Sequence, residues 1–131
     1  MGKTILVVDD DPGVRLFNIT VVEEAGHTAL VAENGEDGLA MAKTASPDLI
    51  LLDVLMPRQS GIKMYRALKT DPDYRSIPVI ILTGISKRSF LKSQQALTQF
   101  GGEPVPEPDA YLEKPVQAET LMAQIRKMLG E

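Results

Sequence analysis

Three short runs of consecutive apolar residues restrict the fold of this chain more than any other feature of its sequence. The runs lie at residues 5–8, 49–52 and 79–82, and none of them alternates between apolar and polar side chains. A strand with one solvated face alternates in this way, whereas a strand that is covered on both faces is apolar throughout. The three runs therefore predict strands of a parallel sheet with helices on both faces.

Two further runs and five helical patterns complete this arrangement. With the polar residues at their ends, the predicted strands are 5–9, 27–32, 48–53, 77–83 and 110–114. Helical spacing of apolar residues follows each strand, in segments 12–25, 34–45, 60–68, 86–100 and 121–129. The first helix has Asp11 and Pro12 as its cap and first position, and Gly26 ends it. Strands that alternate with helices form right-handed β-α-β units, so we expect an α/β, doubly wound sheet in one domain over residues 1–131.

One segment interrupts the alternation before the last strand. Residues 101–110, `GGEPVPEPDA`, place prolines at every second position from Pro104 to Pro108. Proline excludes a helix or a central strand here and favours an extended, polyproline-like path. Two interpretations stay open, a tolerated surface excursion and a dedicated partner site. The chain ends just after the fifth helical pattern, so no attached output domain is expected.

Composition and charge limit the environment and the partners of the chain. It contains no cysteine, which excludes disulfides and is compatible with the cytosol. No apolar run approaches the roughly 20 residues that span a bilayer, and the N-terminus lacks a signal peptide. We therefore expect a cytoplasmic protein without membrane insertion. The net charge of −4 argues against direct binding of nucleic acid.

Polar side chains stand where four of the predicted strands end, namely Asp9 and Asp10, Asp53, Thr83 and Lys114. The carboxyl ends of parallel strands meet at one edge of the sheet, where ligands bind. Three carboxylates held together repel by about 4 kcal/mol per pair at about 4 Å and an effective dielectric near 20, so they need a counter-charge. Mg²⁺, with its preference for oxygen ligands, supplies one. Lys114 adds a second positive charge and Thr83 a hydroxyl donor, so together these groups suit a phosphoryl group.

Each of these residues also has an ordinary structural interpretation. Acidic side chains before Pro12 offset the positive end of a helix dipole and can serve only as a cap. Asp53 can be a turn aspartate, Thr83 a plain strand residue and Lys114 a solvated lysine at a sheet edge. Only their joint placement at the ends of successive strands favours a functional site.

Four stretches, `ILVVDDD`, `PDLILLDVLMPRQSG`, `PVIILTG` and `AYLEKPV`, resemble the receiver domain of two-component response regulators in their order and spacing. The resemblance covers essentially the whole chain and implies a flavodoxin-like sheet with strand order 2-1-3-4-5 and five helices. It implies phosphorylation on Asp53. It also implies Mg²⁺ binding by Asp10, Asp53 and the backbone carbonyl of Leu55, with Asp9 acting through water.

Further matched positions concern the phosphoryl group and its readout. Thr83 matches the hydroxyl residue that meets a phosphoryl oxygen, and Lys114 matches the lysine that pairs with the group. Tyr111 matches the aromatic switch residue, although a tyrosine on this strand can also be an ordinary half-buried residue. Pro115 matches a proline whose preceding peptide bond is cis, which aims Lys114 inward.

The resemblance implies a stand-alone signalling protein and not a true enzyme. Asp53 would accept its phosphoryl group from the phosphohistidine of a sensor histidine kinase or a histidine phosphotransfer protein. Thr83 and Tyr111 would then switch the face of the fourth helix, fifth strand and fifth helix, which an unidentified partner reads. The protein is expected to be a monomer or a weak, phosphorylation-dependent dimer.

Two departures and two alternatives accompany this interpretation. The interval from Thr83 to Lys114 is long for the family because of the proline-rich residues. Leu55 and Ile85, which flank the site, are apolar and cannot orient an attacking water, so slow loss of phosphate is predicted. One alternative is a Mg²⁺-dependent phosphohydrolase resembling the haloacid dehalogenase superfamily, for which Asp9 and the aspartate two residues later give the required Asp-x-Asp spacing. The other is a receiver-like scaffold that is never phosphorylated.

Overall fold

The computed structural model describes residues 2–99 and 102–131. Five strands form one parallel sheet in the order β2-β1-β3-β4-β5, which confirms the predicted fold class and strand order. The strands are β1 Thr4–Val8, β2 Thr28–Ala32, β3 Leu49–Leu52, β4 Val79–Thr83 and β5 Ala110–Glu113. All four pairings in the sheet are parallel, so the carboxyl ends of the strands lie along one edge.

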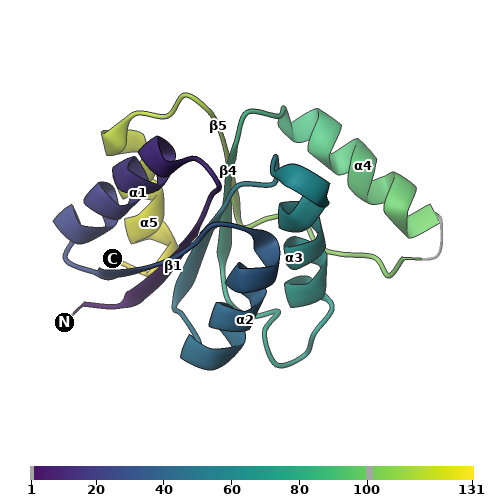
Figure 1. Cartoon of the computed structure of the whole chain (residues 1–131), viewed down its shortest axis with the longest axis horizontal. Coiled ribbons are helices and arrows are strands. Elements are labelled where there is room, and N and C mark those ends of the chain that lie inside the picture. Colours follow the sequence, from purple (N-terminus) through teal and green to yellow (C-terminus); the bar gives the residue numbers. More distant parts are fainter. Residues whose placement is uncertain (1, 100–101) are drawn as a thin grey trace.

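Helices cover both faces of this sheet (Figure 1). They are α1 Pro12–Glu24, α2 Gly35–Ala45, α3 Ser60–Lys69, α4 Lys87–Gln99 and α5 Ala118–Met128. Alternate residues of β1 enter two separate cores: Ile5 and Val7 pack with residues of α1 and α5, and Leu6 and Val8 pack with residues of α2, α3 and α4. This two-sided burial explains why the central strands are apolar throughout. None of the helices in the described part of the chain is both long and apolar enough to cross a bilayer.

Short polar side chains fix the start of three helices, as the sequence predicts for the first two. The carboxylate of Asp11 accepts hydrogen bonds from the amides of Gly13 and Val14, at 2.8 and 3.2 Å, and so caps α1. Asn34 caps α2 in the same way. The sequence predicts Ser86 inside the fourth helix, but this residue precedes α4 and caps it, because its hydroxyl accepts from the Ser89 amide at 3.1 Å.

The connection between β3 and α3 contains a turn that the sequence pattern does not predict. Pro57–Gln59 form a single 3₁₀ turn, η1, in which Arg58 and Gln59 have positive φ angles of 58° and 54°. The turn directs α3 back against the end of β3. A Cβ atom on Gly61 would lie only 2.2 Å from the carbonyl oxygen of Asp53. Because Gly61 has no side chain, α3 can pack directly against the backbone of Asp53.

Residues 102–109, called here the proline-rich segment, connect α4 to β5. They form neither helix nor strand, in agreement with the prediction, and return along α4 toward the sheet (Figure 1). The predicted end of the fourth helix at Phe100, and Gly101 after it, lie outside the described residues. Side chains of α3 contact the proline-rich segment at several points, so it is a packed part of the fold.

The close approach of α3 to Asp53 gives a stability prediction. Gly61→Ala places a Cβ atom against rigid backbone, and overpacking of this kind lowers the free energy of unfolding by about 2 kcal/mol. Gly38→Ala, in α2, is the matched control, because the nearest neighbours of its Cβ atom would be side-chain atoms, Sδ of Met64 at 2.8 Å and Cγ2 of Val8 at 3.0 Å, and not rigid backbone. We expect a clearly smaller loss for the control in urea unfolding. Equal stability of Gly61→Ala and the native protein would show that α3 does not support Asp53 in this way.

Candidate functional site

Three aspartates gather where β1 and β3 end side by side. Val8 pairs with Leu52 in the sheet, so Asp9 and Asp53, the next residues of the two strands, are neighbours at the same edge. Carboxylate oxygens of Asp9, Asp10 and Asp53 all lie within 4.8 Å of one another. Asp9 and Asp53 are buried, whereas Asp10 is exposed. The structure thus brings together the acidic residues that the strand ends predict, and carboxylate oxygens are the ligands that hard divalent cations prefer.

The ammonium group of Lys114 joins two of these carboxylates. Its Nζ atom lies 2.9 Å from Oδ2 of Asp9 and 3.2 Å from Oδ2 of Asp53. The Lys114 amide donates to the carbonyl oxygen of Thr83 at 2.8 Å, and the peptide bond to Pro115 is cis. Burial lowers the pKa of Lys114, but the hydrogen bond to Asp9 and the charge of Asp53 outweigh it, so this pKa lies above its ordinary value. Lys114 is therefore a permanent positive charge in the cluster.

Backbone amides orient the other oxygen of each buried carboxylate. Oδ1 of Asp53 accepts from the Leu55 amide at 2.8 Å, and Oδ1 of Asp9 accepts from the Asp11 amide at 2.9 Å. Burial raises the pKa of Asp9 more than the Asp11 amide and Lys114 lower it. The pKa of Asp9 therefore lies above its ordinary value, and a further positive charge nearby would favour the charged form of this carboxylate.

Thr83 contributes a hydroxyl group without a partner. The residue is fully buried at the end of β4, and its Oγ1 atom has no hydrogen bond to the described residues. Leu52 pairs with Ile81, so Thr83 extends one residue beyond the level of Asp53 on the neighbouring strand. A buried hydroxyl in this condition costs about 1–3 kcal/mol, which makes Thr83 available to any acceptor that enters the site.

Tyr111 lies on β5 away from the carboxylates. Its hydroxyl donates to the carbonyl oxygen of Ile85 at 2.8 Å, in the connection between β4 and α4. Its ring is half-buried and packs against Phe90, with 5.6 Å between the ring centroids. Burial, together with the charges of Glu113 and Asp53, raises the pKa of Tyr111 to about 12. Tyr111 therefore remains a hydrogen-bond donor at neutral pH and connects β5 to the start of α4.

Two residues of α1 also belong to the site, and sequence reasoning missed both. Nη1 of Arg15 donates to the carbonyl oxygen of Asp9 at 2.9 Å and so holds the turn that carries the acidic residues. Its position four residues after the Asp11 cap is a signal that could have identified it. Asn18 is buried, and its Oδ1 atom has no partner within the described residues. A polar residue four positions after Val14, on the apolar face of the helix, was the corresponding signal.

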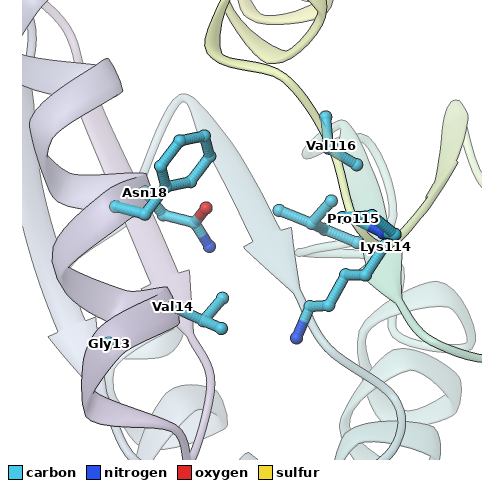
Figure 2. A pocket seen from close by; sticks show the side chains of 8 residues that line it. Gly13, Val14, Asn18, Lys114, Pro115 and Val116 are labelled. Carbon is cyan, nitrogen blue, oxygen red and sulfur yellow. The ribbon is translucent and has the colours of Figure 1, made fainter.

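A mainly apolar cavity of about 400 Å³ separates α1 from the loop that follows β5. The carboxamide of Asn18 and the ammonium group of Lys114 extend toward it from opposite sides (Figure 2). Val14, Pro115 and Val116 line it between them. The walls thus offer the Lys114 side chain few polar partners, which favours its contacts with the two buried carboxylates.

Comparisons of the sequence and of the structure with known proteins all identify the same family. The model of the response regulator receiver domain matches residues 5–126. Protein PilH of Pseudomonas aeruginosa is 38% identical over 127 residues, which are 96% of this chain and 97% of the relative. The polar-differentiation response regulator DivK of Brucella anthropi is 30% identical over 132 residues, which cover 100% of this chain and 99% of DivK. The chemotaxis response regulator CheY4 of Vibrio cholerae has a similar structure, with a TM-score of 0.80, 26% identity and coverage of 98% and 100%.

The family match spans the elements that form the acidic cluster, from β1 to α5. The relatives are full-length matches, and the structural similarity covers the same fold from end to end. This chain therefore belongs to the response regulator receiver domains, the signalling modules of two-component systems.

Proposed function

We propose that Asp53 is the phosphoacceptor of this receiver domain and that it takes its phosphoryl group from a phosphohistidine. The observation that carries the proposal is the contact of the Lys114 ammonium group with Oδ2 of Asp53, at 3.2 Å, inside a cluster of carboxylates. A nucleophilic carboxylate needs nearby positive charge, because the group that it attacks is itself negative. Lys114 provides that charge at the oxygen where it is needed.

In the proposed reaction, a carboxylate oxygen of Asp53 forms a bond to phosphorus while the bond between phosphorus and the donor's imidazole nitrogen breaks. The imidazole leaves with the electron pair and takes up a proton. The Leu55 amide keeps Oδ1 of Asp53 in place, and Lys114 offsets the charge of the transferred group. The hydroxyl of Thr83, which has no hydrogen-bond partner among the described residues, then donates to a phosphoryl oxygen.

The charge of the cluster fits a divalent cation. One ammonium group faces three carboxylates, so two negative charges remain in the cluster. We infer that Mg²⁺ is held by Asp10, Asp53 and the carbonyl oxygen of Leu55, with Asp9 acting through water. When bound, the ion supplies charge stabilisation for phosphoryl transfer. The exposed Asp10 is the carboxylate most open to a ligand from solvent.

We further propose that Tyr111 reports the state of Asp53. Recruitment of Thr83 to the phosphoryl group changes the space at the end of β4, next to the connection that Tyr111 binds through Ile85. A shift of this tyrosine alters the face of α4, β5 and α5, which a downstream protein can read. The donor is a histidine kinase or a phosphotransfer protein, and the setting is a cytoplasmic monomer or weak dimer without direct binding of nucleic acid or membrane.

The position of Asp11 disfavours the phosphohydrolase alternative. That reaction needs Asp9 as the nucleophile and Asp11 as the second member of the Asp-x-Asp pair. The carboxylate of Asp11 instead caps α1 by accepting from the amides of Gly13 and Val14. The Asp11 carboxylate is therefore occupied at the start of the helix, which counts against the role that the alternative gives it.

The first prediction from the proposed function concerns the identity of the phosphoacceptor. Incubation with Mg²⁺ and acetyl phosphate, followed by borohydride reduction and peptide mapping, is expected to label Asp53. The Asp53→Asn variant should give no label, because an amide is not a nucleophile at this site. Asp73→Asn, an exposed aspartate between α3 and β4, is the control and should label normally. Label on Asp9 would support the phosphohydrolase, and a complete lack of label would support the scaffold.

The second prediction concerns the metal and the repulsion in the acidic cluster. Asp10→Asn removes one exposed negative charge, so the metal-free protein should gain about 1 kcal/mol, the energy of two unit charges about 4 Å apart in water. Mg²⁺ at about 100 times its dissociation constant should stabilise the native protein by about 2.7 kcal/mol but the variant far less. Urea unfolding in EDTA and in Mg²⁺ measures both effects. An unchanged Mg²⁺ response in Asp10→Asn would rule this residue out as a ligand.

The third prediction concerns the lifetime of the acyl phosphate. Leu55 lies two residues after Asp53 and its side chain is exposed. It is close to Gly84, the residue after Thr83, because a Cβ atom on Gly84 would lie 3.9 Å from Cδ2 of Leu55. An apolar group at this position cannot orient water for attack on phosphorus. Leu55→Asn should therefore shorten the phosphate lifetime severalfold, as measured by loss of ³²P label, whereas Leu55→Met should leave it unchanged. Equal lifetimes for the native protein and Leu55→Asn would exclude Leu55 as a determinant.

A further inference from the structure

Two neighbouring side chains of α3 attach the proline-rich segment to the domain. The hydroxyl of Tyr65 donates to the carbonyl oxygen of Pro106 at 2.6 Å, and the guanidinium group of Arg66 donates to the carbonyl oxygen of Glu103. Burial raises the pKa of Tyr65, so its hydroxyl keeps its proton and remains a donor. The prolines of the segment have no N–H group for pairing with a strand, and these side chains bind its carbonyl groups instead.

The end of the proline-rich segment is fixed just before β5. The carboxylate of Asp109 accepts from the backbone amide of Val79 at 2.9 Å and lies 3.4 Å from the ammonium group of Lys69. Lys69 is buried and also donates to two backbone carbonyl groups of the connection between α3 and β4. Within the segment, Val105 packs against the core on the α3 and α4 side of the sheet. The segment therefore has a defined position, set mainly by α3.

Arg66 also ties the proline-rich segment to α4. While one nitrogen of its guanidinium group binds Glu103, the other donates to Oε1 of Gln94 at 2.8 Å. Gln94 is a buried residue of α4. A Cβ atom on Gly102 would lie 2.7 Å from the guanidinium group, so a larger residue there would push the segment away from it. The position of α4 and the position of the segment are thus set by the same side chain.

Three aromatic rings lead from β5 to this attachment. Phe90 of α4 stands between Tyr111 and Tyr65, with 5.6 Å between the first pair of ring centroids and 5.7 Å between the second. Phe90 is 1% exposed, and the rings of Phe90 and Tyr65 meet edge to face at 76°. Close-packed interiors do not leave room for one ring to move alone. Phe90 and Tyr65 are both buried, so a displacement of the half-buried Tyr111 changes its contact with Phe90, and a shift of Phe90 in turn displaces Tyr65.

We propose that the proline-rich segment is a second output element, moved by the phosphorylation state of Asp53 through Tyr111, Phe90 and Tyr65. The proposal rests on the function proposed above, because it takes the movement of Tyr111 as its input. Tyr65 is the terminal part of the relay, since its hydroxyl holds Pro106 directly. The segment thereby extends the region that responds to phosphorylation from α4 and β5 toward α3.

Thermodynamic linkage makes the coupling reciprocal. If the state of Asp53 changes the attachment of the proline-rich segment, loosening the attachment must change the conformational equilibrium of Tyr111 by the same factor. Tyr65→Phe is a suitable perturbation, because it keeps the ring against Phe90 and removes only the hydroxyl that binds Pro106. If only the face of α4 and β5 responds to phosphorylation, removing the Tyr65 hydroxyl should have no effect on that response.

The test uses backbone amide NMR spectra of the full chain in Mg²⁺, before and after addition of beryllofluoride as a mimic of the acyl phosphate. In the native protein, the amides of Val54 and Gly84, beside Asp53 and Thr83, and those of Val105 and Glu107 should all shift. In Tyr65→Phe, the first pair should shift as before and the response of the second pair should be lost. Tyr74→Phe is the control, a tyrosine of the α3–β4 connection that packs against the same core, and it should behave as the native protein.

The outcomes separate this inference from the proposed function. If Val54 and Gly84 respond in the native protein while Val105 and Glu107 do not, the relay is wrong and the function stands. If none of the four amides responds, the proposed function itself fails and the relay fails with it. A response of the proline-rich segment that persists in Tyr65→Phe overturns the role of the hydroxyl. The Tyr111→Leu variant gives a second test. Loss of the amide shifts of Val105 and Glu107 in this variant supports the relay, and unchanged shifts contradict it.

Discussion

The fold of this protein must bring a single ammonium group to two carboxylates that are buried at the end of the sheet. Asp9 and Asp53 come from neighbouring strands, but Lys114 comes from the far edge, after β5, and reaches them across the end of β4. Removing one partner of a buried ion pair typically destabilises a protein by about 3–5 kcal/mol. The register between β4 and β5, fixed at the site by the hydrogen bond from the Lys114 amide to Thr83, is therefore as important to the cluster as its acidic residues.

Two polar groups at this edge of the sheet lack full electrostatic or hydrogen-bond compensation. The burial that raises the pKa of Asp9 is unfavourable for its charged form, and the buried hydroxyl of Thr83 has no hydrogen-bond partner in the part of the chain that the structure describes. A cation relieves the first, and an oxygen acceptor relieves the second. The ligands proposed for this site would therefore stabilise it, and a ligand that favours one of two conformations shifts the balance between them.

The sequence is sufficient to predict which residues lie at the ends of the strands, but not the contacts between segments that are far apart along the chain. The apolar runs define the strands, and parallel connections place their carboxyl ends together, so the proximity of Asp9, Asp53 and Lys114 follows without knowledge of any side-chain contact. The role of Gly61 cannot be predicted in this way. Glycine has a low helix propensity, so its place in α3 is explained only by the close approach of α3 to the carbonyl oxygen of Asp53. Arg15 is similar, because a basic residue on an exposed helix is ordinary until its contact with the Asp9 carbonyl is known.

The proline-rich segment shows the same limit more strongly. Its composition predicts an extended path, but its attachment depends on Arg66 and Lys69, which in the sequence resemble solvated charges on the polar side of a helix. Lys69 is buried instead, and its charge is stabilised by carbonyl groups and by Asp109. Contacts between residues about 40 positions apart cannot be inferred from local periodicity.

The energies of the individual contacts also determine how the domain can switch. Tyr111 is held to Ile85, and Tyr65 to Pro106, by single hydroxyl hydrogen bonds, each worth about 1 kcal/mol. Reversing a two-state equilibrium from 1:99 to 99:1 takes about 5.5 kcal/mol of differential binding. The charge-assisted contacts proposed for a phosphoryl group at Lys114 and Thr83 are worth about 1.5–3 kcal/mol each, so the two together are close to this energy. Under the proposed function, phosphorylation of Asp53 would therefore supply enough free energy to outweigh the hydroxyl contacts of Tyr111 and Tyr65.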